Sequence, residues 1–248
     1  MVNIITLFAL KKYLLFLLFA ALCGKIKAQA GYNYAEYGLG FGVSYARPFS
    51  DLKANYNDYV YNVNANYYYT PYVPVTLEIQ FGKLRGGGNT VKEDASTRRF
   101  SNNFKAVLLH ADLQLGQVID YQQSFVLNVL KNFYIGSGLG VMLNSVDANR
   151  ESLIDIGYKF PGSSSSVGLL VPLRVGYELK IYNGYGEPNI RLDFGYQHNI
   201  AFGEGMDGYD DPPTKFKNNA VDQYRQFSVG VKLNLWGGAA YGKSISGN

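Results

Sequence analysis

Hydrophobic and polar residues alternate with a period of two along most of the chain after its first thirty residues. In the first such segment Tyr37, Leu39, Phe41 and Val43 are separated by single glycines. This alternation is typical of a β-strand that buries one of its faces. The pattern recurs, and eight strands are expected at residues 37–46, 59–69, 75–82, 106–116, 133–144, 169–180, 190–197 and 227–235.

The connections between these segments differ in length. Four are long and rich in Gly, Ser, Asn and Asp, and two are tight, with Pro or Gly as turn formers. The long ones are residues 47–58, 84–103, 145–166 and 203–220, and the tight ones are residues 70–74 and 183–188. Long extracellular loops and short periplasmic turns are typical of outer-membrane β-barrels. The pattern therefore predicts that both ends of the barrel chain lie on the periplasmic side.

One connection on the short-turn side is long. Within residues 117–132, Phe125, Val126, Val129 and Leu130 lie at helical spacing. The segment is expected to form either a short amphipathic periplasmic helix or an overhanging hairpin.

Charged side chains share the second face of the later segments. They comprise four acidic and four basic residues: Glu78, Asp112, Arg174, Glu178, Lys180, Arg191, Asp193 and Lys232. In a soluble β-sandwich this face would be exposed to water, and that alternative stays open. An eight-stranded barrel has an interior only wide enough for side chains to fill it. The charges are then expected to pair across the lumen, because an unpaired buried charge is costly.

Glycines on the second face of the first segment favour the narrow barrel over the sandwich. The fold class expected is all-β, an eight-stranded antiparallel transmembrane β-barrel with a polar, filled lumen rather than a pore. Pro172 is expected to mark a bulge or a locally unpaired site in its strand.

Tyrosines gather near the ends of the expected strands, where the two membrane interfaces would lie. Such rings suit the lipid boundary because their hydroxyl groups reach headgroups or water. The outer group is Tyr45, Tyr56, Tyr59 and Tyr61, and the inner group is Tyr67, Tyr69, Tyr72, Tyr182 and Tyr185.

Residues 1–30 read as a cleavable signal peptide. Lys11 and Lys12 precede an apolar run too short to cross a bilayer, and Ala28-Gln29-Ala30 forms a cleavage site. A lipoprotein is disfavoured because Leu22 precedes Cys23. The domains expected are the signal peptide at 1–30, an outer-membrane barrel at 31–236 and a short C-terminal tail at 237–248.

The signal segment also explains the charge of the chain. Its four lysines account for the excess of 23 basic over 19 acidic residues. The balance of the remaining chain gives no sign of nucleic-acid binding. Charged residues make up only 17% of the chain and aromatic residues 15%, which suits strands bordered by membrane interfaces.

Candidate chemistry is sparse, and no catalytic residue, cofactor or metal is expected. The lipid A deacylases use a His, a Ser two residues later and a carboxylate. His110 is followed at that spacing by Asp112, and His198 by Ile200. The carboxylates of Asp207, Asp210 and Asp211 fit no EF-hand loop and are expected to be solvated.

Several segments together resemble the OmpA/OmpX-like outer-membrane barrels of Bacteroidota. They include "EYGLGFGVSYARPFSDL", "NFYIGSGLGV", "LLVPLRVGYELKI", "IRLDFGYQHNIAFGEGMDGYDD" and "DQYRQFSVGVKLNLW". Within that group the chain is similar to the PorG-like barrels of the type IX secretion and gliding apparatus, which share a "VP-x-x-VG" strand. It differs from them at residues 47–51, which read RPFSD.

The resemblance implies a non-enzymatic outer-membrane protein with a structural or docking and assembly role, as a component of type IX secretion. Its expected partners are outer-membrane lipid or lipopolysaccharide, and proteins at the extracellular loops or at residues 117–132. An exported soluble β-sandwich or lipocalin-like binder is the main alternative. A barrel enzyme that modifies lipid A is the third hypothesis.

Overall fold

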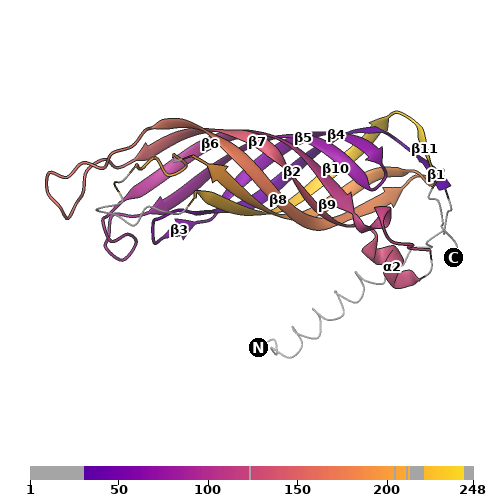
Figure 1. Ribbon diagram of the computed structural model, residues 1–248, viewed down its shortest axis with the longest axis horizontal. Helices are drawn as coiled ribbons and strands as arrows, with labels where there is room; N and C mark the ends of the chain where they lie inside the picture. Colours follow the sequence, from indigo (N-terminus) through magenta and orange to yellow (C-terminus); the bar gives the residue numbers. More distant parts are fainter. Residues whose placement is uncertain (1–30, 123, 204, 211, 213–220, 243–248) are drawn as a thin grey trace, which may run out of the picture. The chain divides into compact units, whose positions relative to one another are not determined.

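A computed structural model describes residues 31–122, 124–203, 205–210, 212 and 221–242 of the chain. The expected signal peptide at 1–30 lies outside these residues. Eight long strands make the main sheet (Figure 1). They are β2 (Tyr37–Phe49), β4 (Asp58–Thr70), β5 (Val73–Gly87), β6 (Arg99–Gln114), β7 (Phe133–Ala148), β8 (Ser165–Tyr182), β9 (Pro188–Phe202) and β10 (Gln223–Trp236).

The main sheet closes on itself as an antiparallel barrel. Each of the eight strands pairs with the next one in the chain, and β10 returns to pair with β2, where Val229 lies opposite Val43. Seven of the eight expected segments lie within one of these strands, and the segment expected at 106–116 runs two residues past the end of β6 at Gln114. The closed sheet confirms the all-β, eight-stranded barrel and rules out the two-layered sandwich.

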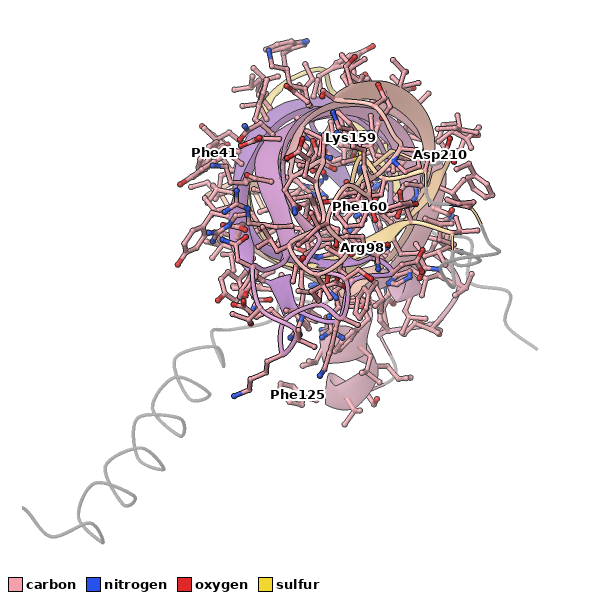
Figure 2. The ribbon with its side chains drawn as sticks, turned by 90° about the vertical axis from the view of Figure 1, so that its left-hand side faces the viewer. Phe41, Arg98, Phe125, Lys159, Phe160 and Asp210 are labelled. Carbon is pink, nitrogen blue, oxygen red and sulfur yellow. The ribbon has the colours of Figure 1, made fainter. Side chains whose placement is uncertain are left out.

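Side chains alternate between the two faces of every strand, as the period-two pattern requires. In β2 the outward Leu39 and Phe41 are about half exposed, at 50% and 53%, whereas Ser44 and Ala46 point inward and are buried. Figure 2 looks into the ring of strands and shows Phe41 outside it. The outward face of the strands is therefore largely apolar, and the inward face holds the expected charged residues together with buried apolar ones.

Aromatic residues meet across neighbouring strands at two levels of the outer face. Toward the long loops, the ring of Tyr45 lies 5.5 Å from that of Tyr59. Toward the short turns, Tyr37 lies 5.4 Å from Tyr67. Tyr72 departs from the prediction, since it is fully buried at the turn end of the lumen. Its position in the tight β4–β5 turn lets its ring fold over the barrel opening, where it contacts Lys180.

The connections follow the predicted lengths. The long loops lie at one end, and one of them carries the short strand β3 (Asn55–Tyr56), which pairs with β5. At the other end the β6–β7 connection forms the 3-10 turn η1 (Leu115–Gln117) and the helix α2 (Phe125–Leu130). Ser124 caps α2, since its Oγ accepts a hydrogen bond from the Leu127 N–H. The helix expected within residues 117–132 is therefore present, and no described helix is long and apolar enough to cross a membrane.

Part of the expected C-terminal tail is structured. Residues Ala239–Gly242 form strand β11, which pairs with β1 (Gly31–Tyr34) in a separate two-stranded sheet. This small sheet lies beside the β4–β5 turn, where Tyr241 meets the ring of Tyr72 at 5.7 Å. The two strands are too short to show a clear alternation, and each depends on a partner at the far end of the chain.

Pro172 interrupts the pairing of β8 with β7, as predicted. Pairing stops between Ser137 opposite Leu173 and Gly140 opposite Leu170, without a shift of register. Ser137 Oγ donates a hydrogen bond of 2.9 Å to the Pro172 carbonyl and bridges this gap. The site is therefore locally unpaired and is not a bulge.

Candidate functional site

The eight charged residues expected on the second face all project into the lumen, in the part nearer α2 and the short turns. Their inward direction follows from the parity of their positions along β5, β6, β8, β9 and β10. Seven are buried, and the side chain of Arg174 is 9% exposed. Four carboxylates thus face four cations inside the barrel, as ion pairs in a low-dielectric interior require.

Arg174 is the centre of one half of this network. Its Nε lies 3.1 Å from Asp112 Oδ1, and its Nη1 lies 3.3 Å from Glu78 Oε2. The same Nη1 lies 2.6 Å from Nε2 of His110. The same Nε2 lies 3.1 Å from Glu78 Oε2, so according to the tautomer it either accepts from the guanidinium or donates to the carboxylate. Nδ1, the other ring nitrogen, lies 3.7 Å from Asp112 Oδ1, so one arginine and one histidine lie between two carboxylates.

Glu178 is the centre of the other half. Its carboxylate accepts hydrogen bonds from Arg191 at 2.8 Å, from Lys232 at 3.0 Å and from the side-chain amide of Gln114 at 3.0 Å. Lys232 also reaches Asp193 at 2.6 Å, and Asp193 lies 3.9 Å from Arg174. The two halves therefore form one continuous network.

Three cations lie side by side in this network. Lys180, Arg191 and Lys232 stand opposite one another on β8, β9 and β10. Like charges in register repel each other, and Glu178, one step along the lumen, offsets this by pairing with two of them. Arg191 additionally lies 3.8 Å from the centroid of the Tyr68 ring, where the negative face of the ring favours a cation.

Lys180 differs from the expected ion pairing. Within the described part of the chain its Nζ donates to the Pro71 carbonyl at 2.9 Å and to Gln114 Oε1 at 2.6 Å. It also lies 4.0 Å from the centroid of the Tyr72 ring. Its partners are neutral because it sits at the turn end of the lumen, where backbone carbonyls and folded-over aromatics are the nearest groups.

The space left inside the network is small. A cavity of about 30 Å³ lies among Glu78, His110, Arg174, Asp193 and Lys232. A buried water needs about 10–15 Å³ of such space, so the cavity has room for about two waters and not for an organic ligand. The lumen is filled by its own side chains at this level.

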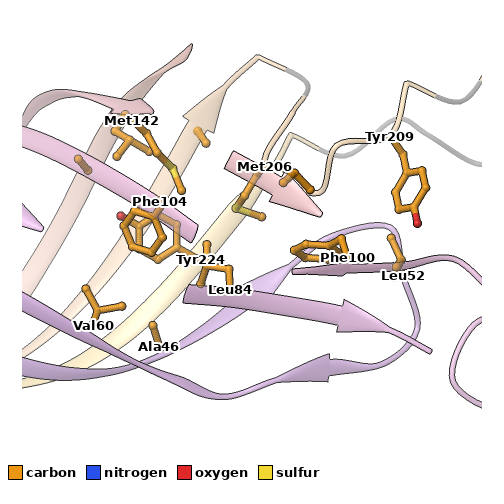
Figure 3. Packing of buried hydrophobic residues seen from close by; sticks show 14 of the residues in the cluster. Ala46, Leu52, Val60, Leu84, Phe100, Phe104, Met142, Met206, Tyr209 and Tyr224 are labelled. Atoms are coloured by element: carbon orange, nitrogen blue, oxygen red, sulfur yellow. The ribbon is translucent and has the colours of Figure 1, made fainter. Parts of the chain in front are cut away.

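The half of the lumen nearer the long loops is lined mainly by apolar residues, beside buried amides such as Asn102 and Asn199, and the sequence prediction did not include this apolar lining. Inward-facing residues of the strands form a packed cluster there (Figure 3). They include Ala46, Val60, Leu84, Phe100, Phe104, Ala106, Leu108, Met142, Leu170 and Tyr224. Their inward parity at the loop ends of the strands is the signal that would have identified them.

The β9–β10 connection closes this apolar half. Met206 and Tyr209 from its described part are buried in the cluster. The Tyr209 hydroxyl accepts a hydrogen bond from the Arg99 N–H at 2.9 Å, and its single proton can go to Asn149 Oδ1 at 2.7 Å or to the Arg99 carbonyl at 2.8 Å. This one side chain therefore ties the β9–β10 loop to the end of the β5–β6 loop and to the start of the β7–β8 loop, and the lumen is blocked at both levels.

Asp207 was expected to be solvated but lies buried, because Met206 and Tyr209 on either side of it pack into the cluster. Burial, and then repulsion by Asp222, raises the pKa of its carboxyl to about 7. Asp51 from the β2–β3 loop acts in the same direction, whereas Arg98 from the β5–β6 loop and the Tyr209 N–H, which donates to Asp207 Oδ1 at 3.0 Å, oppose it. The packed loop therefore prefers a protonated Asp207.

The raised pKa predicts that the packing of this loop depends on pH. The stabilisation is fully present below the ordinary aspartate pKa of about 4 and is lost as the pH rises through about 7. A nitroxide attached to Asp210→Cys, at the exposed end of the segment, should become more mobile across this window. In an Asp207→Asn background the mobility should stay low at every pH. Equal pH responses in the two backgrounds would contradict this account of Asp207.

The two histidines are not placed for hydrolysis. His110 contacts Glu78 and Arg174 inside the lumen, and His198 contacts Gln223 at 2.8 Å near the loop end of the outer face. Among the described residues no cluster of three His, Cys, Asp or Glu side chains could hold a metal ion. Asp211, one of the three loop aspartates, lies outside those residues.

Comparison with known proteins finds solved structures that resemble this chain but does not assign the chain to a family. No family model and no curated protein matches the chain. Among solved structures, Neisserial surface protein A is 15% identical with a TM-score of 0.44, covering 81% of this chain and 98% of that one. The attachment invasion locus protein Ail of Yersinia pestis is 13% identical with a TM-score of 0.41, covering 84% and 99%. The outer membrane protein OprG of Pseudomonas aeruginosa is 13% identical with a TM-score of 0.36, covering 84% and 100%. At these scores the fold rests on the chain's own strand register: it is a closed eight-stranded antiparallel β-barrel with charged residues inside.

Proposed function

We propose that this protein is an outer-membrane β-barrel that neither conducts nor catalyses and has a structural or docking role. The observation that carries the proposal is the apolar outward face of a closed barrel. Every one of the eight strands presents large apolar side chains that are 42–59% exposed: Phe41, Val63, Leu77, Leu109, Leu139, Leu173, Phe194 and Val231. Such a continuous band is unfavourable in water and suits the hydrocarbon of a bilayer.

Closure of the sheet supports the same conclusion. Lipid offers the backbone no hydrogen-bonding partner, so a membrane sheet must have no open edge. Here β2 pairs on both sides, with β4 and with β10. The two aromatic levels on the outer face would then mark the two membrane interfaces, with α2 and the short turns on the periplasmic side.

The interior argues against the two other functions considered. A lipocalin-like binder needs an apolar cavity and a polar outer surface, whereas this barrel has an apolar surface and a cavity of about 30 Å³. A lipid A-modifying enzyme of the deacylase type needs a serine near a lipid-facing histidine. His198 contacts Gln223 and is followed two positions later by Ile200.

A docking role is supported by the tip of the β7–β8 loop. Leu153, Ile154 and Ile156 are 62%, 53% and 95% exposed there, beyond the apolar band and at the end of the long loops (Figure 1). Solvent-facing apolar clusters of this kind mark interaction sites. The narrower role, as a type IX secretion component of a Bacteroidota cell, rests on the sequence resemblance alone.

Fractionation tests the proposal directly. We expect the protein in the outer-membrane fraction, and we expect unheated samples to migrate faster than boiled ones in SDS gels because the closed barrel resists SDS. A mature protein that stays soluble without detergent, and that migrates identically with and without heating, would contradict the proposal.

A further inference from the structure

The helix α2 exposes its apolar side. Phe125, Val126 and Val129 are 55%, 62% and 36% exposed, and none of the six residues of the helix is buried. A helix on the surface of a water-soluble domain places its apolar stripe against the core. In α2 that stripe faces away from the rest of the molecule, so something else must cover it.

The position of α2 shows which environment it faces. The Tyr177 hydroxyl donates a hydrogen bond of 3.2 Å to the Val129 carbonyl. Tyr177 stands on the outer wall of β8 and packs edge-on against Phe133 at 4.8 Å. Both rings lie at the turn-side aromatic level. Just two residues, Lys131 and Asn132, separate the end of α2 from Phe133, and the three chain steps from Leu130 to Phe133 span at most about 10 Å.

The helix also lies to the side of the barrel. In the view along the barrel from the end that carries the long loops, α2 and the labelled Phe125 lie outside the ring of strands (Figure 2). Leu115, the first residue of η1 directly after β6, is 38% exposed and continues the apolar band toward α2. The exposed side of the helix is therefore continuous with the surface that faces lipid.

We propose that α2 is an interfacial foot, whose apolar side chains enter the periplasmic leaflet of the outer membrane among phospholipid chains. This inference rests on the proposed function, since it needs the barrel to lie in a bilayer. Apolar side chains of a helix in the plane of the interface are buried at the boundary of headgroups and acyl chains. The foot would fix the depth of the barrel at its periplasmic end.

Lipid explains the exposed side better than a protein partner does. A stable protein interface buries roughly 800 Å² on each partner, far more than three side chains on a six-residue helix can offer. Interfacial insertion has no such size threshold. The described residues of the β6–β7 connection also include just one acidic and one basic side chain, Asp120 and Lys131, which gives a charged partner little to recognise.

Bromolipid quenching of single-cysteine variants tests the foot. Cys23 is the only cysteine and lies in the expected signal peptide, so the mature chain needs no background substitution. Val126→Cys, Leu39→Cys on the outer wall and Ile156→Cys in the β7–β8 loop are labelled with a small fluorophore. Each is refolded into phosphatidylcholine vesicles with brominated chains, and folding is checked by heat-dependent migration.

We expect the label at position 126 to be quenched about threefold more than the matched apolar loop position 156, and to approach the level of position 39. Quenching at 126 that equals that at 156, while 39 is strongly quenched, would overturn the foot and leave the membrane barrel standing. If the label at position 126 changes its environment only when a periplasmic extract is added, and is not quenched by the brominated lipid, the membrane foot is also overturned in favour of a protein partner. Weak quenching at 39 would instead contradict the proposed function itself.

Discussion

Replacing Arg174 with methionine is expected to destabilise the barrel by about 3–5 kcal/mol, the usual cost of removing one partner of a buried ion pair. The substitution keeps much of the apolar length of the side chain and removes the guanidinium. In this variant Glu78 retains its contacts with His110 and Gln80, and Asp193 retains its ion pair with Lys232. Asp112 loses the one cation that pairs with it among the described residues, and the remaining nitrogen near its carboxylate is His110 Nδ1 at 3.7 Å.

The rescue identifies the cause. Adding Asp112→Asn to Arg174→Met should recover much of the lost stability, since it removes the buried charge that was left alone. Arg85→Met is the matched control, because Arg85 makes a bidentate pair with Asp58 at 2.8 Å on the outside of the barrel and is about half exposed. It should cost about 1 kcal/mol or less. Urea unfolding in vesicles measures all four proteins, and equal losses for Arg174→Met and Arg85→Met would refute the paired lumen.

Gly138→Val should prevent the barrel from closing or should destabilise it by well over the ~1–3 kcal/mol that is usual for overpacking. Gly138 lies on β7 and faces inward, directly opposite His110 on β6. A Cβ at this position would overlap the Leu109 carbonyl oxygen and approach the His110 Cα to 2.5 Å. Backbone cannot move aside as a flexible side chain can, so β6 would shift and carry His110 away from Arg174.

Gly168→Val provides the comparison. Gly168 also faces inward, on β8, but an added Cβ would meet just the Phe202 carbonyl oxygen at 3.5 Å, an ordinary contact. This variant should fold and show the compact, heat-sensitive band, whereas Gly138→Val should yield little of it. Normal folding of both variants would mean that the strands are not packed as closely as described.

The barrel and its charges were predictable because each depends on a local pattern. Alternation within β2 alone reveals which side chains face out, and parity then places Glu78 and Lys232 inside without any knowledge of their partners. The α2 helix was predictable as one of two alternatives for the same reason, since the helical spacing of Phe125, Val126 and Val129 is a local pattern.

The features that were missed depend on contacts between distant parts of the chain. Strands β1 and β11 form just one short sheet together, so neither carries a signal by itself. Tyr72 resembles the other tyrosines of the inner group in sequence, and only the fold of the tight β4–β5 turn directs its ring inward over Lys180. The apolar cluster of the lumen could be inferred from the even positions of Phe100, Phe104 and Leu108 on the inward face of β6. It was missed because the whole interior was expected to be polar.

Single-channel recording in planar bilayers tests the central claim most directly, which is that the barrel proposed to lie in the membrane is filled by its own side chains. Insertion of the wild-type protein is first established by its resistance to alkaline extraction and by its compact migration. Because the lumen is blocked by the Glu78–Arg174–Glu178 network at one level and by Met206 and Tyr209 at the other, the inserted protein should give no conductance above the bare bilayer. Stable conductance steps of constant size from inserted protein would contradict the account.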